Sequence, residues 1–168
     1  MSILMWVGIV AGALVLVLVV LPVSWLLIAG SKADGVAVDI EAPDRIPPEQ
    51  PFEIVVTIRN QLDRPRVLRS IDFDSSLLKG FAIDTIDPEP HDQSSLLATT
   101  TFYYKKLPIP PRGSTTARLR ARSLAIGEYT GTIAVFVDRA HTNSQDTPFR
   151  IFVGAGPSHR HHTHSISR

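Results

Sequence analysis

Histidines gather near the C-terminus of this chain at a spacing that suits metal binding. His159, His161, His162 and His164 place four imidazoles within six positions. Imidazoles this close together can hold zinc, nickel or copper. A histidine-rich end is equally typical of a plain disordered terminus. We expect the tail to bind metal adventitiously in vitro, and we favour the disordered terminus over a physiological metal site.

Three arginines form a second candidate feature. Arg118, Arg120 and Arg122 alternate with apolar residues, which is the spacing of one face of a β-strand. Neighbours on such a face stand about 7 Å apart, so the guanidinium groups repel one another unless anions face them. Those anions are either acidic side chains of adjacent strands or the phosphates of lipids or the carboxylates of a partner. The stripe is therefore the best surface candidate for partner or lipid contact, with cross-strand pairing as the simpler interpretation.

The remaining polar clusters do not assemble a catalytic pattern. Asp72 and Asp74 share one face of an expected strand, where two carboxylates can bind a hard cation or act as acid and base. A solvated strand face produces the same pair without any site. His91 and His141 are the only histidines before the tail, and neither has the oriented support that a catalytic triad needs. We predict no catalytic residues, no cofactor and a protein that is not an enzyme.

Charge and composition narrow the function further. The chain has 17 basic and 16 acidic residues and no cysteine. A near-neutral domain lacks the basic footprint by which proteins collect nucleic-acid phosphates, so we expect no nucleic-acid partner. The absence of cysteine excludes thiolate metal sites and fits a bacterial or archaeal protein, or a domain that faces the cytoplasm.

The first 31 residues contain no Asp, Glu, Lys or Arg and are almost entirely apolar. Because a spanning helix needs roughly 20 apolar residues, we predict one transmembrane helix over 1–31 that acts as a signal anchor. Trp6 and Trp25 would stand about 28 Å apart along it, so we expect them at the two membrane interfaces. Gly8 and Gly12 form a GxxxG motif, which permits pairing of two such helices.

A cleaved secretory signal peptide is the competing interpretation of this segment. Such a peptide has a basic N-terminal region and an apolar stretch of about 7–15 residues. This chain has no basic residue there, and its apolar stretch is about twice as long. Residues 29–31 are small enough for cleavage, so removal of the helix stays open.

After a linker at 32–35, the apolar residues follow the two-residue period of β-strands. Short extended segments separated by turn residues predict an all-β, two-sheet antiparallel sandwich of about eight strands over 36–153. We expect one helical turn at 75–80, a loop at 87–97, no central strand at 107–113 and a disordered His-rich tail at 154–168. The expected strands cover 36–41, 52–59, 67–74, 81–86, 98–105, 115–123, 127–137 and 149–153. In the third of them, the alternation puts Val67, Arg69, Ile71 and Phe73 on one face.

Four segments carry a resemblance to a known family: 38–43, 51–60, 109–114 and 127–131. Their layout resembles the immunoglobulin-like adhesion-type modules of bacterial and archaeal surface proteins, the CARDB group. One departure is that Arg112 separates the proline and glycine of the turn before a strand. The resemblance implies an immunoglobulin-like sandwich and a non-enzymatic role in adhesion or interaction at the outer face of a prokaryotic membrane.

Two alternative functions remain open at this stage. The chain would be an accessory subunit of a membrane complex if the spanning helix makes the main contacts, or a metal-handling surface protein if the histidine tail does. For the interaction domain we expect an unknown protein partner, reached through loops or by strand addition. Lys32 and Arg45 favour a cytoplasmic domain by the positive-inside rule, whereas the short N-terminal stub and the domain type favour the opposite. We expect the N-terminus in the cytoplasm and the domain outside it.

Overall fold

A computed structural model describes residues 31–139, 143–155 and 160–166. The predicted transmembrane helix over 1–31 lies outside these ranges apart from its last residue, and so do Trp6, Trp25, Gly8 and Gly12. Among the described residues, no helix is both long and apolar enough to cross a membrane.

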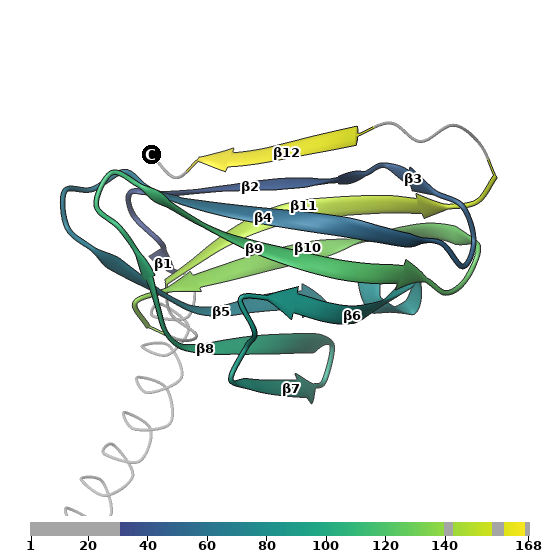
Figure 1. The fold of residues 1–168 in the computed structure, drawn as a ribbon, viewed down its shortest axis with the longest axis horizontal. Helices are drawn as coiled ribbons and strands as arrows, with labels where there is room; N and C mark the ends of the chain where they lie inside the picture. The colour runs from purple at the N-terminus through teal and green to yellow at the C-terminus, as the bar shows by residue number, and fades with distance from the viewer. Residues whose placement is uncertain (1–30, 140–142, 156–159, 167–168) are drawn as a thin grey trace, which may run out of the picture. The chain divides into compact units, whose positions relative to one another are not determined.

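The described chain is an all-β sandwich of two sheets (Figure 1). Sheet A has the strand order β1-β11-β10-β5-β8-β7, with β3 beside β11, and sheet B has the order β12-β2-β4-β9-β6. The long strands pair antiparallel, and the short β3 pairs parallel to β11. The strands are β1 (Ser31–Lys32), β2 (Val36–Pro43), β3 (Arg45–Ile46), β4 (Pro51–Asn60), β5 (Arg66–Asp74), β6 (Phe81–Asp87), β7 (Asp92–Leu96), β8 (Thr99–Ile109), β9 (Ser114–Ser123), β10 (Gly127–Val137), β11 (Asn143–Val153) and β12 (Arg160–Ile166).

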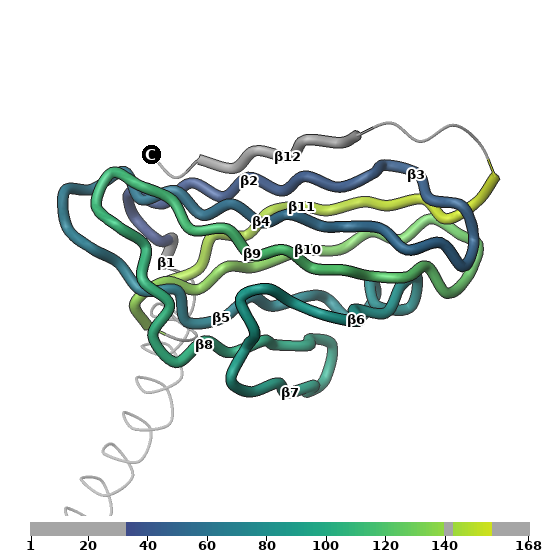
Figure 2. The backbone as a smooth tube through the Cα atoms, in the orientation of Figure 1, coloured from purple at the N-terminus to yellow at the C-terminus, as the bar shows by residue number. Residues whose placement is uncertain are grey.

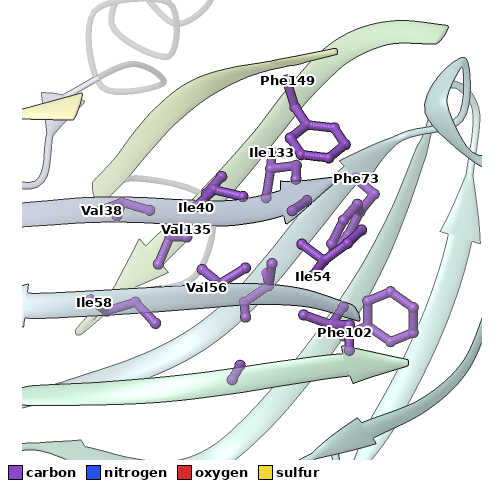
Figure 3. Close-up of a cluster of buried hydrophobic side chains, with 14 of the residues drawn as sticks. Val38, Ile40, Ile54, Val56, Ile58, Phe73, Phe102, Ile133, Val135 and Phe149 are labelled. Carbon is purple, nitrogen blue, oxygen red and sulfur yellow. The ribbon is translucent and has the colours of Figure 1, made fainter. Parts of the chain in front are cut away.

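The hydrophobic core lies between the two sheets and is built from alternate residues of each strand. In β4, Ile54, Val56 and Ile58 are completely buried while the residues between them are not. Figure 3 shows Ile54 near Phe73 of β5 and Phe102 of β8, with Val56 and Ile58 following along β4. Burying a side chain of this size contributes roughly 1.5–3 kcal/mol. The predicted alternation in this strand is therefore confirmed.

Strand β5 departs from simple alternation. Leu68, Ile71 and Phe73 are all buried, whereas Arg69 is half-exposed. The predicted grouping of Arg69 with Ile71 and Phe73 on one face is wrong. In its pairing with β10, β5 has one extra residue between Leu68 and Ser70. A bulge adds one residue to a strand and so reverses the phase of the following side chains.

One strand, β7, was not predicted, and another, β8, extends beyond its predicted end. The expected loop at 87–97 contains β7, which pairs with β8 from Thr99 to Tyr103. Strand β8 continues to Ile109, and Pro108 in it lies opposite Val67 of β5. Because β7 does not reach this far, β5 is the one strand beside Pro108 in the described part of the chain. Pro108 therefore has an edge position, which a proline tolerates.

The C-terminal residues form a strand where disorder was predicted for 154–168. Residues 160–166 are β12, which pairs antiparallel with β2 so that Arg160 lies opposite Pro43 and Ile166 opposite Ala37. The prediction is thus corrected for these residues. The polar sequence of this segment favoured disorder. Main-chain hydrogen bonds to the edge of β2 nevertheless form a strand there, because such bonds do not require apolar side chains.

The predicted helical turn is present as a 3₁₀ helix at Leu77–Lys79. The amide of Gly80 donates to the Leu77 carbonyl at 2.9 Å. Gly80 has an ordinary negative φ, so it is not needed for a left-handed conformation. A Cβ at this position would overlap the ring of Tyr129. The close packing of Tyr129 therefore explains the glycine.

Candidate binding groove

Two strands end their sheets on the same side of the sandwich. Strand β6 pairs with β9, strand β7 pairs with β8, and neither has a second strand partner among the described residues. Figure 2 shows both strands at the lower side of the molecule, with β7 outermost. An edge strand presents unpaired N–H and C=O groups that can pair with another chain.

A hollow of about 510 Å³ opens between these two strands. Its walls include Ile83 and Asp84 of β6, Gln93 of β7 and Glu89 of the connecting loop, and Phe102 of β8 contributes its ring. A second hollow of about 210 Å³ adjoins it and shares Ile83, Gln93 and Phe102. We call this continuous feature the β6–β7 groove.

The larger hollow is acidic. Asp84, Glu89 and Asp92 line it, and no Lys or Arg does. The carboxylate of Asp84 accepts from Arg122 Nη2 at 3.1 Å in an exposed pair. Asp92 Oδ1 accepts from the amide of Gln93 at 2.8 Å. The hollow thus offers at least one carboxylate, that of Glu89, for which the structure describes no ion pair.

His91 lines the larger hollow and holds the loop before β7 in place. Its backbone amide and its Nδ1 both donate to the carbonyl of Tyr103, each at 2.9 Å. Since a carbonyl can only accept, Nδ1 carries the proton in this contact. The two bonds fix the loop before β7 to strand β8. Within the described ranges, no group of three or more His, Asp or Glu side chains is arranged to hold a metal ion.

The predicted arginine stripe lies on the outer face of sheet B. Arg118, Arg120 and Arg122 are exposed and alternate with buried residues of β9. Arg118 lies 3.6 Å from Glu53 of β4, and Arg122 lies 3.1 Å from Asp84 of β6. Acidic residues of both neighbouring strands thus supply anions for Arg118 and Arg122. Exposed pairs contribute at most about 1 kcal/mol, so contact of the stripe with a partner or lipid stays a prediction.

The other predicted residues are not brought together. Asp74 Oδ2 accepts from the amide of Thr132 at 2.7 Å and so links β5 to β10, while Asp72 is half-exposed on the same strand.

Of the predicted metal ligands, His159 lies outside the described residues, as does His141. His161, His162 and His164 belong to β12. Their register partners in β2 are Ala42, Glu41 and Asp39. Metal binding by the tail stays a prediction.

An ion pair with a buried arginine was missed by sequence analysis. Arg66 is 3 % exposed, and its Nε lies 2.6 Å from Asp138 Oδ2. Arg66 Nη1 also donates to the carbonyl of Asp34 at 2.8 Å, and Asp138 Oδ1 accepts from the amide of Val67 at 3.0 Å. These bonds join the start of the domain to the turn after β10. Nothing in the periodicity distinguishes this arginine from an exposed one.

Two further groups have shifted pKa values. Burial raises the pKa of the Tyr104 hydroxyl to about 12, and the charge of Asp87 adds to the effect. The hydrogen bond from Arg112 lowers the pKa of the Asp63 carboxyl, and the charge of Arg112 acts in the same direction. The latter pair is exposed, so it marks a surface turn and not a site.

Comparison with known proteins gives distant similarities only. No family model matches the chain, and no curated protein sequence resembles it. A cupredoxin domain of amoB from Nitrosocaldus yellowstonii has 11% identity and a TM-score of 0.45 over 76% of this chain and 92% of that domain. A cohesin module from a Clostridium perfringens family 33 glycoside hydrolase has 10% identity and a TM-score of 0.46 over 71% and 98%. AvmM, which catalyzes macrocyclization in alchivemycin A biosynthesis, has 15% identity and a TM-score of 0.45 over 75% and 92%. Similarities this distant carry no argument about a ligand or an activity.

Proposed function

We propose that this chain is a non-enzymatic, membrane-anchored interaction domain that receives an extended segment of a partner protein at the edge of β6. The anchor is the apolar segment 1–31, and the domain faces away from the cytoplasm. Its finer fold is that of an immunoglobulin-like adhesion module. The segment layout at 38–43, 51–60, 109–114 and 127–131 supports that assignment.

The observation that carries the proposal is the groove beside β6. Gln93, Ser95 and Phe102 belong to sheet A, and they line hollows next to β6. A strand added to β6 in the plane of sheet B would lie over these residues. Sheets stack about 10 Å apart and neighbouring strands about 4.8 Å apart, so one added strand is the element that fits the space.

Strand addition also suits the main chain of β6. Strand β6 pairs with β9 on one side, and no main-chain hydrogen bond is described on its other side between Ala82 and Asp87. In strand addition, main-chain hydrogen bonds supply affinity, and pockets for alternate side chains supply specificity. The β6–β7 groove offers both components.

Site-specific photocrosslinking in native membranes tests the proposal. A photoreactive benzoylphenylalanine replaces Gln93, which lines the groove, or Ser94, which is exposed on the same strand and does not line it. We expect a crosslinked partner from position 93 and at least about tenfold less from position 94. Equal crosslinking from both positions, or none from position 93, would contradict strand addition.

A further inference from the structure

We infer that the segment bound in the β6–β7 groove carries a Lys or Arg side chain and, two residues along, an aliphatic side chain. This inference rests on the proposed function and names the chemistry of its partner. It follows from the different linings of the two adjoining hollows and from the spacing of side chains on a strand.

The larger hollow fits the cationic side chain. Asp84, Glu89 and Asp92 line it without any Lys or Arg among the lining residues. Ile83 and Ile86 line it as well, which suits the methylene stem of Lys or Arg. The ion pair of Asp84 with Arg122 is exposed, so it is weak enough to exchange for a pair with a bound cation.

The smaller hollow fits the aliphatic side chain. Leu78, Phe81, Ala82 and Ile83 line it together with Phe102, and no charged residue does. The two hollows are adjacent because they share three lining residues. Alternate residues on one face of a strand are about 7 Å apart, which lets one strand place consecutive inward side chains in the two hollows.

The same charges argue against a second copy of this chain as the occupant. Strand β6 carries Asp84 and Asp87, and its register with β9 shifts between Ile83 and Thr85. Pairing of two β6 edges would bring like charges together, and irregular, charged edges resist such pairing. A basic segment of another protein meets no such repulsion.

A peptide panel tests the inference with the full chain in lipid nanodiscs. The probes are seven-residue peptides of alternating Thr and Val in which two positions, two residues apart, carry all natural side chains. We expect the retained peptides to carry Lys or Arg at one position and Leu, Ile or Val at the other. Raising the salt concentration should weaken the preference for the cation.

Two pairs of variants separate the possible outcomes. Gln93→Trp fills the groove and Ser94→Trp is its control on the other side of β7. The double variant Asp84→Asn with Glu89→Gln removes two charges from the groove. Its control, Glu128→Gln with Asp146→Asn, removes two exposed charges from sheet A.

The inference predicts that Gln93→Trp abolishes binding and that the groove double variant lowers the preference for Lys or Arg at least about tenfold, while both controls bind normally. Two results would overturn the inference and leave strand addition standing. In the first, Gln93→Trp blocks the peptides but they show no preference for Lys or Arg. In the second, they show that preference but the groove double variant leaves it unchanged. If no retained peptide is blocked by Gln93→Trp, the proposed function itself is wrong.

Discussion

Replacing Tyr104 by Phe should not destabilise the domain at neutral pH and should protect it at high pH. Tyr104 is 4 % exposed, and its hydroxyl has no hydrogen-bond partner among the residues that the structure describes. A buried hydroxyl without a partner costs about 1–3 kcal/mol, so Tyr104→Phe should leave the free energy of unfolding at pH 7 unchanged or raise it by up to that amount.

The effect at high pH follows from the shifted pKa of Tyr104. Burial raises this pKa from 10.0 to about 12 in the folded protein. The folded state therefore holds the proton more tightly than the unfolded state. The stability that this provides is complete below pH 10 and is lost as the pH rises through 12. Each pKa unit corresponds to about 1.4 kcal/mol, so the loss is on the order of 2–3 kcal/mol, and Tyr104→Phe should not show it.

Urea unfolding of fragment 32–168, followed by circular dichroism at pH 7 and between pH 10 and 12, measures both effects. We expect this fragment to fold alone with a β-type spectrum, because the described hydrophobic core begins at Ala33. Tyr129→Phe is the control, since its hydroxyl donates to the Ala125 carbonyl at 3.1 Å and its loss should cost about 1 kcal/mol. A loss above about 1 kcal/mol for Tyr104→Phe at pH 7, or an equal decline of the wild type and Tyr104→Phe between pH 10 and 12, would refute the reasoning.

Three further changes test the core, the Arg66–Asp138 ion pair and the C-terminal strand. Val56→Asp should unfold the domain, because an unpaired carboxylate at a completely buried position costs several kcal/mol, comparable to the whole stability; Thr57→Asp on the opposite face should still give a cooperative urea transition. Asp138→Ala should lower the free energy of unfolding by about 3 kcal/mol, because it leaves the buried Arg66 charge without its partner. Adding Arg66→Met should restore part of the lost stability. No recovery in the double variant would contradict a stabilising role for the ion pair. Ending the chain at Gly154 should preserve the fold and abolish nickel binding. It should also promote self-association on a sizing column, because removal of β12 opens the edge of β2. Retained nickel binding would place a metal site within the domain.

The fold could be predicted where burial alone sets the pattern. In β4 and β9, one face is buried and the other solvated, so apolar and polar residues alternate and the arginines at 118, 120 and 122 fall on the outer face. The two-sheet sandwich follows from several such strands. The alternation could not reveal the bulge in β5, since one inserted residue reverses the pattern from Ser70 onward.

Strands held by main-chain pairing and not by burial escaped prediction. All five residues of β7 are exposed, so this strand has no apolar face to detect. Strand β12 likewise follows a polar, histidine-rich sequence. The groove itself depends on β6 and β7 ending different sheets on one side. No local pattern encodes this arrangement, and the sequence predicted only a loop at 87–97.

Amide hydrogen exchange across the whole chain, with and without a peptide retained by the groove, tests the central claim most directly. If the peptide adds to β6 as a strand, amides on the open edge between Ala82 and Asp87 should exchange at least about tenfold more slowly in the complex. Amides of β12, at the other edge of sheet B, should be unchanged. Protection at the β7–β8 turn or on β12 without protection of β6 would show that the partner docks elsewhere and would contradict strand addition.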